Sequence, residues 1–266
     1  MDDTEIKWLI ALLLAAAAAA AAWFFWDRSE PPPIAPAAVE QQAPVAEPAE
    51  PLHPVEPLSI SPGEGELVAL PPLEESDSYF ALALIDIFGP ELETLLAEEA
   101  LIDKTVATVD NLTRGRIAEK IRPVGRLSGN FIVSAASDNG PFYLSPENYD
   151  RYRPLVTMVT GADHDELIAT YRRFYPLMQE AFAQLGYPDG YFNDRVIAVI
   201  DHLLATPEPE EPIRLVQPHV LYKFADPELE ALSSGQKLLI RMGPDHAARI
   251  RDFLTELRTH IAQPPR

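Results

Sequence analysis

A polar helix face between residues 191 and 205 is the part of this chain best suited to acid–base chemistry. The side chains that helical spacing places on this face are Asp194, Arg195, Asp201 and His202. Paired carboxylates would suit a glycoside hydrolase, with Glu180 of the preceding helix as a further candidate. Asp194 and Asp201 lie about 10.5 Å apart along the helix axis, whereas inverting glycosidases separate their carboxyl groups by about 6.5–9.5 Å. This spacing fits poorly, so a solvated helix face is the competing interpretation.

Tyrosine and arginine gather in the middle of the chain. Seven of the nine tyrosines lie between residues 143 and 191, with arginines interleaved among them. Tyrosine offers contact area with a polar tip, and arginine binds carboxylates through two parallel hydrogen bonds. These properties predict a glycan-binding or peptide-binding groove, for which the candidate residues are Tyr171, Arg172, Tyr175 and Arg195. The alternative is the rim of a core, where hydroxyl and guanidinium groups satisfy buried carbonyls.

Several other chemistries have no support in the sequence. The chain contains no cysteine, which excludes thiol catalysis, disulfides and cysteine-based metal sites. None of the six histidines has another histidine three or four residues away, so a helix-borne zinc site is not expected. The acidic run at residues 163–166 is better explained as the start of a helix than as a chelating site. No nucleotide-binding loop or hydrolase elbow occurs, and we expect neither a metal nor a cofactor.

Residues 8–26 form an uncharged apolar segment that begins and ends with tryptophan. As a helix it would span roughly 28 Å at about 1.5 Å per residue, close to the thickness of a hydrocarbon core of about 30 Å. Tryptophans at both ends suit the membrane interface. A cleaved signal peptide is the alternative, but signal peptides begin with basic residues, whereas this chain begins with three acids and Lys7 alone. We therefore predict a retained anchor, residues 1–30, that contacts the lipid bilayer through residues 8–26.

The side of the membrane is predicted from the architecture. Lys7 and Arg28 flank the apolar segment equally, so the positive-inside rule gives no direction. A short N-terminus followed by a large domain favours an N-terminus in the cytoplasm. In a Gram-negative bacterium the protein would cross the inner (cytoplasmic) membrane once and display its C-terminal domain in the periplasm.

A spacer without a core follows the anchor. Residues 31–72 hold 12 prolines and six glutamates but no lysine or arginine. This composition predicts a disordered, extended tether with polyproline II character. The whole chain carries a net charge of −20, of which the first 30 residues carry −3 and the spacer −6, leaving −11 for the rest. An acidic domain argues against nucleic acid as a partner.

Helical periodicity dominates the C-terminal domain, residues 73–266. Apolar residues recur at helical spacing within residues 80–88, 167–185, 196–204 and 247–261. One further helix is expected between Pro90 and Arg114. Residues 131–134 and 142–144 bracket an Asn-Gly turn, which predicts one small β-hairpin. The predicted fold class is therefore mainly α: a transmembrane helix, a disordered Pro-rich spacer and a helical domain with one small hairpin.

A family resemblance rests on a series of motifs in this domain. They are Tyr171-Arg-Arg-Phe-Tyr-Pro-Leu177, Leu185-Gly-Tyr-Pro188, Phe192-Asn-Asp-Arg195, Ile200-Asp-His-Leu-Leu-Ala-Thr-Pro-Glu208, Phe224-Ala-Asp-Pro227 and Gly235-Gln-Lys-Leu-Leu239. With the anchor and spacer, they resemble an uncharacterised, mostly proteobacterial membrane-anchored family, domain of unknown function 3014. The resemblance covers most of residues 70–262. It implies a bacterial membrane-anchored protein, and it implies no activity, substrate or site.

Three functional hypotheses follow from the sequence. The first is a non-enzymatic binding or scaffolding module of the bacterial envelope, with an envelope protein or the cell wall as partner. The second is a peptidoglycan hydrolase that uses the carboxylates named above. The third is an assembly factor whose alanine-rich anchor pairs with other helices.

Overall fold

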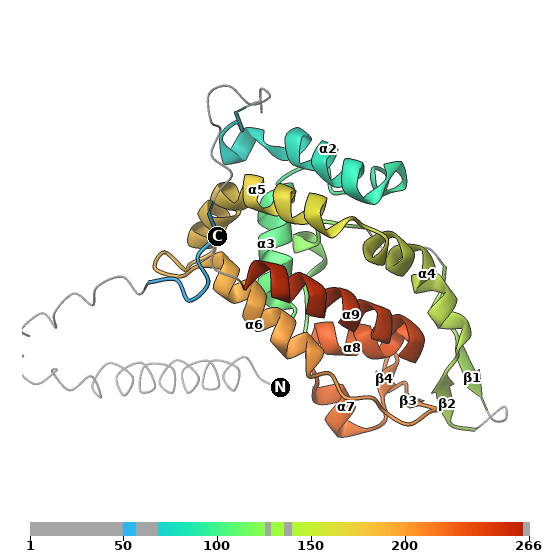
Figure 1. Cartoon of the computed structure of the whole chain (residues 1–266). Coiled ribbons are helices and arrows are strands. Elements are labelled where there is room, and N and C mark those ends of the chain that lie inside the picture. Colours follow the sequence, from blue (N-terminus) through green and yellow to red (C-terminus); the bar gives the residue numbers. More distant parts are fainter. Residues whose placement is uncertain (1–49, 57–68, 126–128, 136–139, 263–266) are drawn as a thin grey trace, which may run out of the picture. The chain divides into compact units, whose positions relative to one another are not determined.

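The computed structural model describes residues 50–56, 69–125, 129–135 and 140–262. Helices dominate these ranges, so the mainly helical character is confirmed (Figure 1). The helices are α2 (Asp77–Phe88), α3 (Leu101–Asn111), α4 (Glu147–Thr160), α5 (His164–Gln184), α6 (Phe192–Leu204), α7 (Pro227–Ala231), α8 (Ser234–Met242) and α9 (Pro244–Ile261). Short 3-10 turns lie at Leu73–Glu75, Pro90–Leu92 and Glu119–Ile121.

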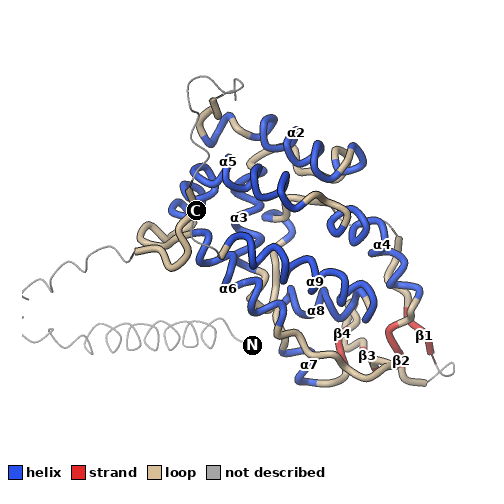
Figure 2. Tube along the Cα trace, in the orientation of Figure 1, coloured by secondary structure: helices blue, strands red, loops and turns tan. Residues whose placement is uncertain are grey.

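The single predicted hairpin is part of a larger sheet. Four antiparallel strands follow the order β1 (Val133–Ala135), β2 (Phe142–Leu144), β3 (Arg214–Val216) and β4 (Lys223–Phe224). The expected pair, β1 and β2, is present, but Phe142 of β2 also pairs with Leu215 of β3. The predicted hairpin is confirmed, but the domain holds a larger sheet than expected, because the β2–β3 pairing joins segments far apart in the chain. Figure 2 shows the strands gathered at one end of the domain beside α7.

The helix predicted between Pro90 and Arg114 is wrong in its first half. A 3-10 turn and a loop occupy that stretch, and α3 begins only at Leu101. Asp77 in the first turn of α2 accepts hydrogen bonds from the backbone N–H groups of Ala100 and Leu101, at 2.7 and 2.6 Å. These are donors that a helix start leaves without an intrahelical partner. The cap comes from another element, so no local pattern announces it.

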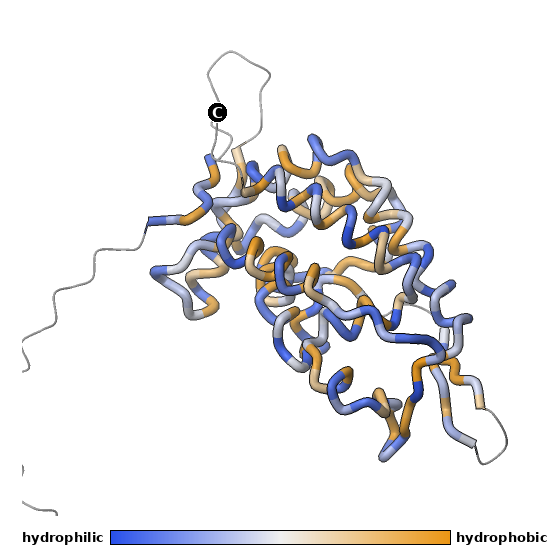
Figure 3. The backbone as a smooth tube through the Cα atoms, turned by 60° about the horizontal axis from the view of Figure 1, so that its bottom comes forward, coloured by the Kyte–Doolittle hydropathy of each residue, from blue (hydrophilic) through white to orange (hydrophobic). Residues whose placement is uncertain are grey.

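The apolar faces of α2, α3 and α5 build the largest core. Ile102 and Val106 of α3 have no exposed surface, and Phe174 of α5 packs on Phe80 of α2 with ring centroids 5.0 Å apart. Phe192, the first residue of α6, is buried in the same cluster. Hydrophobic and hydrophilic stretches are intermixed along the chain of the domain (Figure 3). Full burial of one such side chain contributes about 1.5–3 kcal/mol, so Phe192 helps to hold the start of α6 against α2, α3 and α5.

One short stretch before the helices also packs on the domain. Residues 50–56, which we call the docked segment, hydrogen-bond to α6 and to the residue that follows α9, and Val55 contacts the core cluster. The spacer predicted for residues 31–72 includes this segment, and most of its other residues lie outside the described ranges. No helix within the described ranges is long and apolar enough to cross a bilayer. The predicted anchor, residues 8–26, lies outside those ranges and stays a prediction.

Candidate functional site

The first turn of α6 holds the main chain of the docked segment. The carboxylate of Asp194 accepts hydrogen bonds from the backbone N–H groups of Leu52 and His53, at 3.0 and 2.8 Å. Each oxygen of the carboxylate takes one donor. Hydrogen bonds to an ionised acceptor are about twice as strong as neutral ones. The start of a helix also favours a negative charge, so Asp194 is well placed to bind two consecutive peptide groups.

Asn193, beside it, is fully buried and joins four parts of the fold. Its side-chain amide donates to the carbonyls of His53 and Ile261, at 2.8 and 3.1 Å. Its oxygen accepts the hydroxyl of Tyr171 on α5, at 2.9 Å. Burial, with smaller contributions from Tyr175 and Asp194, raises the pKa of Tyr171 well above its ordinary value. The hydroxyl therefore stays neutral and acts as a donor, which leaves the amide of Asn193 free to donate to the docked segment.

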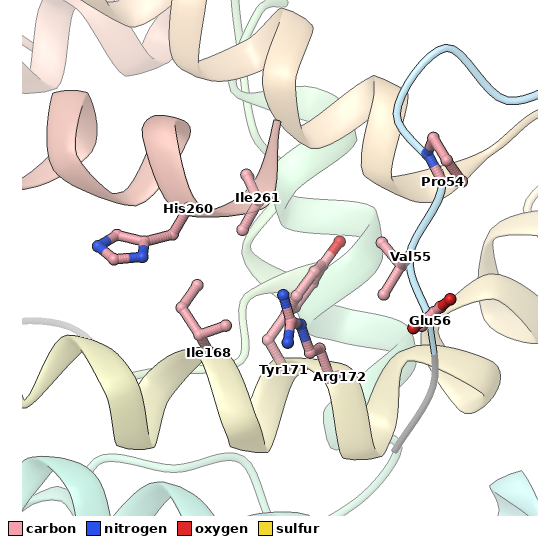
Figure 4. Close-up of a pocket in the computed structure, with 8 residues that line it drawn as sticks. All are labelled: Pro54, Val55, Glu56, Ile168, Tyr171, Arg172, His260 and Ile261. Atoms are coloured by element: carbon pink, nitrogen blue, oxygen red, sulfur yellow. The ribbon is translucent and has the colours of Figure 1, made fainter. Parts of the chain in front are cut away.

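A small pocket next to this pair receives the end of the docked segment. It is lined by Pro54, Val55, Glu56, Ile168, Tyr171, Arg172, His260 and Ile261. Figure 4 shows Val55 beside Tyr171, on the side of the pocket away from His260. The remaining cavity measures about 10 Å³, which is no more than the space one water needs. Little space therefore remains between the docked segment and the surface formed by α5, the start of α6 and the end of α9, which we call the groove.

Asp201, the second carboxylate of the predicted pair, binds a different partner. Arg258 of α9 donates to it through two nitrogens, at 2.5 and 3.0 Å. This hydrogen bond lowers the pKa of the Asp201 carboxyl below its ordinary value, despite a smaller opposing effect of desolvation. A carboxylate held in the charged form by an arginine is a poor general acid at neutral pH.

The same ion pair predicts a pH dependence of stability. Because the folded pKa of Asp201 is lowered, its stabilisation is present above the unfolded pKa of about 4 and disappears as the pH falls through the folded pKa. The pair is exposed, so Asp201→Asn should lower the free energy of unfolding by less than about 1 kcal/mol at pH 7. Urea unfolding of both chains between about pH 7 and about pH 2.5 checks this. A difference that stays constant or grows towards the acidic end would contradict it.

The other two predicted acid–base residues also have structural partners. His202 lies 2.9 Å from the hydroxyl of Ser233, and the side chain of Gln236 donates to the carbonyl of His202 at 3.2 Å. These contacts fasten the end of α6 to the start of α8. Glu180 is exposed on α5 and accepts from Gln184 of the same helix, at 3.3 Å. Asp194, Asp201, His202 and Glu180 thus each have a different partner in the described structure. These contacts do not form an acid–base pair.

The tyrosine and arginine candidates divide between the groove and the core. Tyr171 and Arg172 border the pocket that holds Val55. Tyr175 is buried and donates to Gln179, at 3.2 Å. Burial raises the pKa of Tyr175 as well. Arg195 forms an ion pair with α3. The groove interpretation thus suits Tyr171 and Arg172. The core-rim interpretation suits Tyr175 and Arg195.

Asp110 of α3 is a structural residue that sequence reasoning missed. Its side chain is only 3% exposed and accepts from Arg195 and Arg114, each at 2.8 Å. Arg195 also donates to the backbone carbonyl of Asp110 and to the hydroxyl of Thr113. The sequence signal for its burial was its position: Asp110 follows Val106 by four residues, which places the acid on the apolar face of the helix. Such a buried acid requires a cationic partner, which Arg195 supplies from α6 and Arg114 from four residues later in the chain.

One group of predicted residues does lie together in the part of the chain that the structure describes. Asp194, Tyr171 and Arg172 border the same groove, and Asn193 connects the first two. These residues contact peptide groups and an apolar side chain. No group of three histidine, aspartate or glutamate side chains within the described ranges is arranged to hold a metal ion. The groove is therefore the candidate functional site.

Comparison with known families agrees with the resemblance in the sequence. A family model described as "Protein of unknown function (DUF3014)" matches residues 101–258, which is more than half of the chain. The chain belongs to this family. The DUF3014 match includes α3, both halves of the Asp110 ion pair and the first turn of α6. No curated protein and no solved structure matches the chain.

Proposed function

We propose that this DUF3014 protein is a membrane-tethered binding module of the bacterial envelope. In this proposal residues 8–26 hold it in the inner membrane, the helical domain faces the periplasm, and the groove at the start of α6 takes part in binding. The observation that carries the proposal is the set of hydrogen bonds by which Asn193 and Asp194 hold the main chain of Leu52 and His53. A groove that binds main-chain groups and one apolar side chain has the features of a peptide-recognition site.

A binding role also suits the remaining chemistry of the described domain. Asp194 is engaged by two backbone donors and Asp201 by Arg258. Glu180 is exposed, and its described hydrogen bond stays within its own helix. No described contact favours an acid–base pair, so a hydrolase is not proposed.

The test of the proposal is a pull-down from crosslinked cells that express the full chain. We expect one or more envelope proteins to be enriched over a control chain that contains only residues 1–72. An Asp194→Ala full chain should recover less of the same protein. If nothing is enriched over the tether-only control, the proposed binding function is wrong.

The predicted topology has a separate test. A reporter that works only outside the cytoplasm, fused after Arg266, should be active. A reporter that works only in the cytoplasm should be silent at the same position. The reverse pattern, or a mature chain that begins beyond residue 26, would contradict the proposed localisation.

A further inference from the structure

We infer that the groove at the start of α6 is an exchangeable peptide site, occupied here by the docked segment of the same chain. Its ligand in trans is a segment of another protein with the same chemistry. That chemistry is two consecutive residues with free backbone N–H groups, then a proline, then a small branched apolar residue. The inference depends on the proposed function in one respect: the partner is taken to be an envelope protein.

The first step is that the groove binds main chain. Asp194 takes the N–H groups of Leu52 and His53, and Asn193 takes the carbonyl of His53. Leu52 is 80% exposed, so its side chain contributes little. Groups present in every peptide thus supply these three hydrogen bonds. The only requirement is that neither of the two residues is proline, since proline has no N–H.

The second step is that the prolines keep the backbone N–H groups of the segment available. Pro51 and Pro54 flank the two residues that Asp194 binds. A residue before a proline is restricted to extended conformations, and an extended polyproline-like chain forms no internal hydrogen bonds. The N–H groups of residues 52 and 53 are therefore available before docking. The docked segment bends at Leu52 and His53, so docking turns both N–H groups toward the one carboxylate of Asp194.

The third step is side-chain selection one residue after the second proline. Val55 is half-buried against the main core cluster and shares a pocket with Tyr171 and Ile168 (Figure 4). The little space left in this pocket favours a small branched side chain over an aromatic one. The same order of residues recurs in the tether, where Gln42 and Ala43 precede Pro44 and Val45. The chain thus contains two segments that meet the requirements of one groove.

The fourth step is that the docked segment can leave at low cost. Its described attachments are three hydrogen bonds to Asn193 and Asp194, one between the His53 ring and the carbonyl of Ala262, and the half-buried residues Pro51, His53 and Val55. Segments with few buried apolar contacts open at low free energy. Its advantage over a free peptide is its effective concentration, which is in the millimolar range for a short flexible connection. A partner that is concentrated nearby, or that binds more tightly, can displace it.

The experiment uses full chains in lipid nanodiscs and a capped, fluorescent peptide with the sequence of residues 50–56. In one chain, residues 42–56 are replaced by a glycine–serine stretch of equal length. Fluorescence anisotropy should show the peptide binding to this chain. It should bind the natural chain at least tenfold more weakly, because the natural segment competes. Adding Asp194→Ala to the glycine–serine chain should weaken binding at least tenfold.

Variant peptides separate main-chain recognition from nonspecific adhesion. A peptide carrying His53→Pro lacks one N–H that Asp194 accepts, and Val55→Asp places a charge in the apolar pocket. Both should bind at least tenfold more weakly than the natural peptide, whereas His53→Ala should change binding by less than threefold. A peptide of residues 40–46 should compete with the first.

Three results would overturn the inference. One is no peptide binding to the glycine–serine chain when its circular dichroism spectrum and cooperative thermal unfolding show that it is folded. Another is equal binding of the His53→Pro peptide. The third is displacement of the docked segment by a disaccharide-peptide fragment of the cell wall but not by the peptide.

The inference and the proposed function can fail separately. If the pull-down recovers a partner while the peptide does not bind, the exchangeable site is wrong and the proposed function is supported. If the peptide binds as expected while the pull-down recovers nothing, the exchangeable site is supported and the proposed function is wrong.

Discussion

Replacing Asp110 with asparagine is expected to lower the free energy of unfolding by about 3 kcal/mol. Asp110 is 3% exposed and receives charge-assisted hydrogen bonds from Arg195 and Arg114. Asparagine keeps the volume but removes the charge, which leaves the Arg195 guanidinium without its counter-ion. The effect lies at the low end of the range for breaking a buried pair, because the Arg195 side chain is 28% exposed and keeps some hydration. Urea unfolding followed by circular dichroism measures the change.

A matched control for Asp110 is available on α4. Asp150 pairs with Arg153 three residues later, but both side chains are about two-thirds exposed. Asp150→Asn should therefore change the free energy of unfolding by less than about 0.5 kcal/mol. Equal losses for the two substitutions would mean that the Asp110 pair is solvated and does not hold α3 against α6.

Replacing Asn193 with alanine is expected to cost a similar amount, about 3 kcal/mol. Asn193 has no exposed surface and makes three hydrogen bonds, to Tyr171, His53 and Ile261. The substitution leaves the hydroxyl of Tyr171 and the carbonyl of Ile261 buried without these partners. The penalty for each such buried group is about 1–3 kcal/mol. The same urea titration measures it.

Asn111 provides the control for this substitution. It is also a helical asparagine, but it is half-buried, and its side chain makes one described hydrogen bond, to the carbonyl of Ala107. Asn111→Ala should cost less than about 1 kcal/mol. If Asn193→Ala is no more harmful than Asn111→Ala, then Asn193 does not join α5, α6 and α9 as described.

The sequence allowed the helices to be predicted where their signals are local. The apolar face of α5 and the cap at its start are both readable within a few residues, and the side chain of Asp163 does accept from the N–H of Glu166. The start of α3 was not predictable in this way, because Asp77 caps it from another helix. The pairing of β2 with β3 was not predictable for a similar reason, since Phe142 and Leu215 lie far apart in the chain.

The candidate site was predictable in its residues more than in their roles. The polar start of α6 and the tyrosine and arginine cluster were identified, and Asp194, Tyr171 and Arg172 do lie at one groove. What binds there was not predictable, because the docked segment lies within a proline-rich stretch that looks like featureless tether. The N–H groups of Leu52 and His53 find a binding partner only when the fold places them beside Asp194.

Amide hydrogen exchange of the docked segment in the full chain tests the central claim most directly. Pro51 and Pro54 have no amide hydrogen, so the signal of Leu52 and His53 can be separated from that of their neighbours. The account predicts that these two amides exchange at least tenfold more slowly in the natural chain than in an Asp194→Ala chain. Equally fast exchange in both chains would show that α6 does not hold this segment, and the account would be wrong.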